Sequence, residues 1–120
     1  MAYKMQMGDD GILRLAFAGD IDREEMEAFR EEFRPFLEAA TEAEPLLVLS
    51  DSREGGKFSS VARKIFLDLN RHPHIGRAAV VGPNRYTRVL ASLVIKATGR
   101  DNIHFFGSEV EALVWLKAEG

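Results

Sequence analysis

The sequence lacks cysteine, long apolar runs and any glycine-rich phosphate-binding loop, and each of these absences excludes a class of protein. Without cysteine there can be no disulfide, no zinc ribbon and no thiol nucleophile. No apolar stretch approaches the roughly 20 residues that span a bilayer, so we expect no transmembrane helix. Residues 1–11 also lack the basic and apolar regions of a signal peptide, and we therefore expect a cytoplasmic protein.

Residues that carry catalysis or bind metal are also scarce. The three histidines are His72 and His74, on either side of a proline, and His104 in a predicted strand. A metal site needs three or four converging ligands, so turn residues are the better interpretation of the first two. Asp51, Ser52 and His104 could meet as a hydrolytic triad, although their spacing does not require it. We expect no enzyme, no cofactor and no metal. Because aromatic residues are sparse among the basic ones, we also expect no nucleic-acid partner.

What the sequence does contain is the composition of one globular domain, which we assign to residues 1–120. Hydrophobic residues make up 46% of the chain and charged residues 29%, which is ordinary for a folded domain. The charges are segregated: the net charge is −8 over residues 1–52, +8 over residues 53–100 and −3 over residues 101–120. Either the acidic and basic helices neutralise one another, or the basic part faces an anionic partner.

Hydrophobic periodicity predicts an α/β fold. A period of two indicates strands at residues 3–7 and 12–18, joined by a Gly/Asp turn as a hairpin. Continuous apolar runs indicate buried strands at residues 45–50 and 76–82, followed by a last short strand at residues 102–106. Helical periodicity fills the intervals between strands. We therefore expect a mixed, mainly parallel sheet of about five strands with about four helices.

Capping residues mark where the predicted helices begin. Capping boxes at residues 22–25 and 108–111 begin the first and last helices. Either Ser59 or Ser60 can cap the second helix, and Asn84 can cap the third. Pro35 lies within the apolar stripe of the first helix, so it should kink that helix without ending it.

The third predicted helix has more apolar residues than one buried face requires. The residues that we expect to cluster on one side are Tyr86, Val89, Leu90, Leu93 and Ala97. At 100° per residue, Ile95 lies nearly opposite that cluster and close to Arg88. An exposed Ile95 beside Arg88 and Lys96 would suit contact with an anionic membrane. Alternatively, Ile95 packs beneath a neighbouring helix or a dimer partner.

Polar residues after the strand at 45–50 form the first candidate site. Residues 51–57 leave the carboxyl end of a buried strand, which is where ligands bind in open α/β sheets. We interpret them as a loop in which Gly55 and Gly56 allow movement over a ligand, or else as a plain surface loop. The predicted ligand-binding residues are Asp51, Ser52, Arg53, Lys57, Phe58 and Arg85.

The arrangement of several short segments carries a family resemblance. Residues 18–22 precede the long first helix, an apolar strand ends at Ser50 and Asp51, and residues 58–60 lead into the second helix. An Ala-Val-Val-Gly strand at 79–82 and a helix after residues 105–107 follow. Over nearly the whole chain, this arrangement resembles the SpoIIAA-like branch of the STAS family. The resemblance implies a SpoIIAA-like fold and a non-catalytic function.

In family members of the anti-sigma-antagonist type, a partner kinase phosphorylates a serine in an Asp-Ser-Ser-Gly-like turn. Here Ser60 falls at the phosphoacceptor position and Ser59 falls where the family has Asp. The flanking Phe58 and Val61 depart from the family pattern. The resemblance therefore implies that Ser59 and Ser60 are sites of phosphorylation or partner contact, with simple helix capping as the alternative.

Two functions remain open at this point. The SpoIIAA-like branch also resembles lipid-carrying domains of the Sec14 type, which implies binding of a small apolar or amphiphilic anion. Such a module could touch a membrane through Arg88, Ile95 and Lys96. The alternative is a regulatory module that binds a protein through the first turn of the second helix. The first strand is a candidate edge of the sheet that Lys4 protects only in part, which leaves a homodimer open as well.

Overall fold

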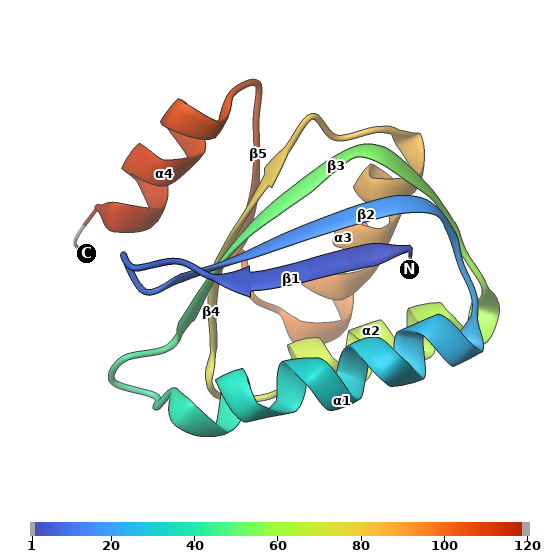
Figure 1. Cartoon of the computed structure of the whole chain (residues 1–120), viewed down its shortest axis with the longest axis horizontal. Coiled ribbons are helices and arrows are strands. Elements are labelled where there is room, and N and C mark those ends of the chain that lie inside the picture. Colours follow the sequence, from blue (N-terminus) through green and yellow to red (C-terminus); the bar gives the residue numbers. More distant parts are fainter. Residues whose placement is uncertain (1, 119–120) are drawn as a thin grey trace.

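The computed structural model describes residues 2–118, which form one five-stranded sheet with helices on both faces (Figure 1). The strands are β1 (Tyr3–Met7), β2 (Ile12–Ile21), β3 (Leu46–Phe58), β4 (Ile75–Val81) and β5 (Ile103–Phe106), in that spatial order. β1 pairs with β2 in the antiparallel sense, and every other neighbouring pair is parallel. The predicted mixed sheet with an N-terminal hairpin is confirmed.

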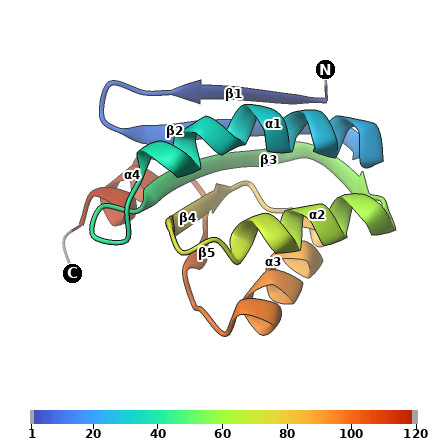
Figure 2. The ribbon, with the colours of Figure 1, turned by 90° about the horizontal axis from the view of Figure 1, so that it is seen from below.

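Four helices pack on this sheet: α1 (Arg23–Ala39), α2 (Ser60–Asn70), α3 (Arg85–Thr98) and α4 (Glu109–Lys117). The first three each connect one parallel strand to the next strand along the sheet. Because such crossovers are right-handed and all advance in one direction, α1, α2 and α3 lie on the same face. α4 follows the last strand and packs on the opposite face (Figures 1 and 2). We call these the inner face and the outer face, respectively.

Aromatic residues fill the core between the inner face and α1. Phe17 of β2 lies 5.4 Å from Phe29 of α1, ring centre to ring centre, and Phe29 stacks on Phe33 at 5.3 Å. All three side chains are buried. The acidic residues of α1 lie mainly on its solvent side, so the amphipathic pattern of that helix is satisfied by this single layer.

The predicted N-cap residues are confirmed. Asp22 and Ser108 accept from the amides of Glu25 and Glu111, but the return hydrogen bond of a capping box is not formed among the described residues. Ser59, rather than Ser60, caps α2, because its hydroxyl accepts a hydrogen bond from the Ala62 amide at 3.1 Å. The Asn84 side chain accepts from the Thr87 amide at 3.0 Å and begins α3. α1 continues through Pro35 to Ala39, as expected from the unbroken apolar stripe.

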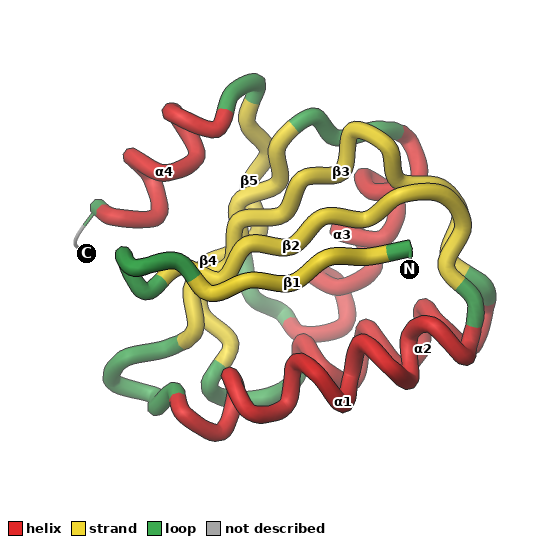
Figure 3. Tube along the Cα trace, in the orientation of Figure 1, coloured by secondary structure: helices red, strands yellow, loops and turns green. Residues whose placement is uncertain are grey.

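The segment 51–57 is not a loop, contrary to our expectation. β3 runs on to Phe58 and pairs with the end of β2 through Ala18, Gly19 and Ile21, so both strands are long and curved (Figure 3). A Cβ atom at Gly56 would lie 2.8 Å from the backbone carbon of Gly19, so glycine lets the two strands approach there. Gly55 and Gly56 therefore lie in a paired strand, and they do not form the mobile loop that we expected over a ligand.

The predicted orientation of α3 is wrong. Its buried residues are Leu90, Ala91 and Val94, whereas Val89 is 59% exposed and Leu93 is 39% exposed. Three of the five residues expected to cluster inward, Val89, Leu93 and Ala97, are therefore exposed. An apolar surface on α3 is left uncovered within the described chain.

Candidate functional site

Strand alternation separates the predicted ligand-binding residues into two groups. Asp51 and Arg53 line hollows on the outer face of the sheet, together with Lys4 and Ala16. Ser52, between them in sequence, faces the interior and is only 2% exposed. Phe58 is also buried on the inner side. The six residues therefore do not form a single site.

On the outer face, Asp51 and Arg53 satisfy each other. Arg53 Nη2 lies 2.7 Å from Asp51 Oδ2, and the Arg53 amide also donates to the same carboxylate at 3.1 Å. The guanidinium of Arg53 lowers the pKa of Asp51 below its ordinary value, chiefly through their side-chain hydrogen bond. Because Arg53 is already engaged by this carboxylate, it is less available to hold an anionic ligand.

Lys57 and Arg85 meet beside Tyr86, at the start of α3. The Arg85 guanidinium lies 4.8 Å from the centre of the Tyr86 ring and donates a hydrogen bond to its hydroxyl at 2.8 Å. The Lys57 ammonium lies 6.0 Å from the same ring. Lys57 and Tyr86 border an open cleft of about 300 Å³ between the first turns of α2 and α3. The cleft is lined by Lys57, Phe58, Arg63, Tyr86, Val89 and Leu90.

The predicted serines lie at the same end of α2 and differ in role. Ser59 is held by helix capping, whereas Ser60 occupies the first helical position and is exposed. Arg63 Nη2 lies 3.4 Å from the Ser60 hydroxyl. Val61, in the same turn, is 42% exposed. The start of α2 therefore presents a hydroxyl, a cation and an apolar side chain to solvent.

The three predicted membrane-contact residues do not share one exposed surface. Ile95 is half-buried and packs with Val80, Val94 and Ile103, which favours the alternative in which it packs within the fold. Membrane contact through these three residues stays a prediction. Arg88 lies over the Phe105 ring, 4.9 Å from its centre. Lys96 is exposed in the last turn of α3.

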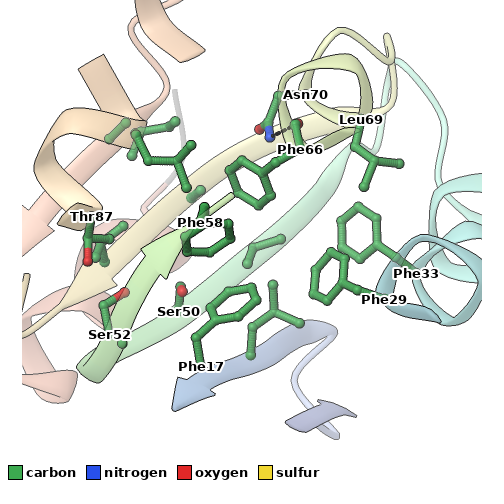
Figure 4. Close-up of a pocket in the computed structure, with 18 of the residues that line it drawn as sticks. Phe17, Phe29, Phe33, Ser50, Ser52, Phe58, Phe66, Leu69, Asn70 and Thr87 are labelled. Carbon is green, nitrogen blue, oxygen red and sulfur yellow. Dashed lines mark hydrogen bonds between the residues drawn. The ribbon is translucent and has the colours of Figure 1, made fainter. Parts of the chain in front are cut away.

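An internal cavity of about 70 Å³ lies between the inner face and the helices (Figure 4). Its walls are largely aromatic and aliphatic and include Phe17, Phe58 and Phe66. Polar side chains in the lining include Ser52 and Thr87. The Ser52 hydroxyl is buried and has no hydrogen-bond partner in the described structure. This hydroxyl lies in the wall of the cavity, and none of residues 2–118 forms a hydrogen bond with it.

Tyr86, Val89 and Arg63 are site residues that sequence reasoning missed. The first two were assigned to the buried side of α3, and Arg63 was not singled out. The rule that sites form at the carboxyl ends of parallel strands does identify this end of the sheet, because α2 and α3 start there after β3 and β4. It does not identify which side of α3 faces solvent.

The candidate triad is not assembled. Asp51 and Ser52 point to opposite faces of β3, and His104 stacks on Trp115 with 4.5 Å between ring centres. Among residues 2–118, no three or more His, Cys, Asp or Glu side chains gather where they could hold a metal ion. Over the same residues, no helix has the length and apolar character to cross a membrane.

Comparison with known proteins places the chain in a family. A family model described as SpoIIAA-like matches residues 12–117. The chain belongs to the SpoIIAA-like family. No curated protein matches it. The family assignment agrees with the sheet order and with the position of α1, α2 and α3 on one face.

Solved structures show the same SpoIIAA-like fold. An uncharacterised protein of the DUF3478 family from Shewanella loihica PV-4 has a TM-score of 0.73 at 21% identity, over 96% of this chain and 92% of the other. The anti-sigma factor antagonist SpoIIAA in its unphosphorylated form has a TM-score of 0.72 at 14% identity, over 98% of this chain and 100% of the other. A candidate anti-sigma factor antagonist from Thermotoga maritima has a TM-score of 0.68 at 16% identity, over 97% of this chain and 95% of the other. At these identities the likeness shows the fold alone.

Proposed function

We propose that this SpoIIAA-like domain is a non-catalytic regulatory module that binds a protein partner at the first turns of α2 and α3. The observation that carries this proposal is the open cleft of about 300 Å³ between those turns, in which Tyr86, Val89 and Leu90 are bordered by cations. An apolar centre with a polar rim is the usual anatomy of a protein interface. The exposed Val61 and Leu93 extend the apolar surface on α2 and α3 beyond the cleft.

The charge of this surface indicates the chemistry of the partner. Lys57 and Arg63 line the cleft and Arg85 lies beside Tyr86 in the first turn of α3, while none of the described residues that line the cleft is a carboxylate. Complementary charge raises the association rate and excludes partners of like charge. The partner surface should therefore carry carboxylates around an apolar contact.

The family supports a regulatory partner. SpoIIAA is described as an anti-sigma factor antagonist, and its fold matches this chain over nearly its full length. Ser60 is exposed beside Arg63, so a phosphate there would change the charge of the surface that we assign to the partner. A regulatory module of this type can work with or without phosphorylation of Ser60.

The test begins with a partner captured from cells of the source organism and then purified. Its affinity is measured by isothermal titration calorimetry for the wild type and for Val89→Glu. Loss of an exposed apolar contact, together with repulsion between carboxylates, should weaken binding at least tenfold. Ala39→Glu places the same charge on an exposed position in the last turn of α1, away from the first turns of α2 and α3, and is the matched control, which should bind like the wild type.

Salt and serine variants sharpen the result. Affinity should fall as salt rises, because the cations of the cleft are exposed to solvent. Ser60→Asp should weaken the interaction more than Ser60→Ala, since it adds a carboxylate at the rim. Equal affinity of the wild type and Val89→Glu would overturn the proposed surface. Co-sedimentation with anionic vesicles in place of a protein partner would overturn the proposed class of partner.

A second candidate function rests on the internal cavity. We propose that it accommodates a small, mostly apolar molecule whose one polar group satisfies the Ser52 hydroxyl. At about 70 Å³ the cavity is well below the roughly 300–1,000 Å³ of usual ligand pockets, so the ligand would have only a few heavy atoms. Short-chain alcohols should shift the NMR signals of cavity-lining methyl groups. The filled-cavity variant Ala91→Leu should abolish the shift; unchanged wild-type spectra would reject this function.

A further inference from the structure

The outer face of the sheet is only partly covered. α4 packs over β3, β4 and β5, with Ala112 and Leu116 buried against the strands. The remaining outer face, over β1 and β2, is a groove made of two adjoining hollows of about 280 and 570 Å³. Both hollows include Lys4 and Ala16 in their lining. Ala18 continues the same row of small side chains along β2.

The far side of α4 is also uncovered and apolar. Val110 is 72% exposed and Val114 is 68% exposed, which are the largest values among the exposed large hydrophobic residues of the described chain. These two residues are one helical turn apart. At 100° per residue they lie opposite Ala112 and Leu116, so they point directly away from the sheet on which α4 packs. No element of the described chain covers them.

We infer that two copies of this chain pair outer face to outer face, with α4 of each copy seated in the groove of the other. The two-fold axis of this dimer lies between the two sheets and runs parallel to the strands. Rotation about it places α4, which packs over β4 of its own chain, over β1 and β2 of the partner. The two α4 helices then lie side by side in one layer between the sheets. Each half of the interface is the same, as a two-fold dimer requires.

The strand register brings complementary groups together in this arrangement. Lys4 pairs with Ala16, Ala16 with Asp51, Asp51 with Val81, and Val81 with Phe106, so all five residues lie at one level along the strands.

α4 begins three residues after Phe106, close to that level. An axis parallel to the strands preserves the level, so the first turn of the partner's α4 arrives over Ala16 and Lys4. Val110 in that turn then faces the small side chain of Ala16.

Charge supports the same pairing. Glu109 and Glu111 lie in the first turn of α4. Lys4 forms no ion pair among the described residues, whereas Arg14 is paired with Asp10 at 2.7 Å. The groove lining holds three cations, Lys4, Arg14 and Arg53, and three carboxylates, Asp51, Glu54 and the chain's own Glu109. Because Arg14 and Arg53 are paired with Asp10 and Asp51, Lys4 is the cation of the lining that is left for the acidic first turn of the partner's α4. This dimer uses the face opposite the cleft between α2 and α3, so it stands independently of the proposed function.

Sedimentation velocity over a range of protein concentrations tests the inference. The wild type should reach twice the monomer mass of 13.4 kDa. The double variant Val110→Glu, Val114→Glu should remain monomeric with an unchanged circular dichroism spectrum, because both side chains are exposed in the single chain. Val89→Glu, with the same change on α3, is the matched control and should still form the dimer.

Cysteine cross-linking then tests the geometry, since the native chain has no cysteine. Val110→Cys chains mixed with Ala16→Cys chains should form a disulfide-linked heterodimer under mild oxidation, and Val89→Cys mixed with Ala16→Cys should not. A wild type that stays monomeric at every concentration would refute the inference. A dimer that survives the double glutamate change would refute it equally.

Discussion

Replacing Ser52 with alanine should stabilise this protein, against the usual trend for a buried position. The Ser52 side chain is 2% exposed, and its hydroxyl has no hydrogen-bond partner in the described structure. Burying a polar group without a partner costs about 1–3 kcal/mol. Alanine removes that cost and gives up only the contacts of one oxygen atom. We therefore expect the free energy of unfolding to rise by about 1 kcal/mol.

Urea denaturation measures this change directly. The midpoint should move to higher urea with an unchanged slope, because the surface exposed on unfolding hardly changes. Ser50→Ala is the matched control, because Ser50 lines the same cavity from the same strand but is only half-buried, and its hydroxyl is not among the buried, unpaired polar atoms of the described residues. It should alter stability by less than about 0.5 kcal/mol. A Ser52→Ala protein less stable than the wild type by about 1 kcal/mol would refute the reasoning, since its hydroxyl would then be bound to cavity water.

Four further substitutions test the caps and one ion pair. Ser59→Ala should cost about 1 kcal/mol in urea denaturation and Ser60→Ala almost nothing, because only the first serine caps α2. Asn84→Ala should cost about 2 kcal/mol, since the side chain caps α3 and also donates to the carbonyls of residues 52 and 55; a cost below that of Ser59→Ala would count against this double role. The hydrogen bond from Arg14 lowers the pKa of Asp10 in the folded protein. The pair therefore stabilises the fold fully at pH values above the ordinary pKa of an aspartate, and this stabilisation is lost as the pH falls through the lowered pKa. Asp10→Asn should therefore show a shallower loss of stability below about pH 4, and equal acid profiles would contradict that role.

The fold is predictable from the sequence because its signals are local and agree with one another. The caps at Ser59 and Asn84 fix where two helices begin, and the alternation of strand and helix fixes a parallel sheet. The handedness of the crossovers then places α1, α2 and α3 on one face. None of these steps requires knowledge of which side chains meet in three dimensions. Pro35 illustrates this, because the apolar stripe continues on both sides of it and predicts that the helix continues despite the loss of one backbone hydrogen bond.

The site is less predictable because it depends on contacts between distant elements. Residues 51–57 have the glycines and charges of a loop, yet they are held as a strand by pairing with the end of β2. The side of α3 that is buried is decided by the shape of the sheet beneath it. Since apolar residues occur on several sides of that helix, periodicity alone favoured Val89 over Ala91. The same misreading hid the exposed apolar surface on which the proposed function rests.

The two faces of the sheet differ in a way that permits two separate interactions. On the inner side, the cleft between α2 and α3 is rimmed by cations and carries the exposed Ser60, whose charge can be changed by modification. On the outer side, Val110 and Val114 meet the partner's groove at Ala16 and Ala18 of β2, and this contact needs no modification. A partner could therefore bind or leave at the inner side while the outer side keeps two copies together. Each dimer would then present two copies of the cleft to a partner with two acidic surfaces, and avidity would follow from the symmetry of the pairing.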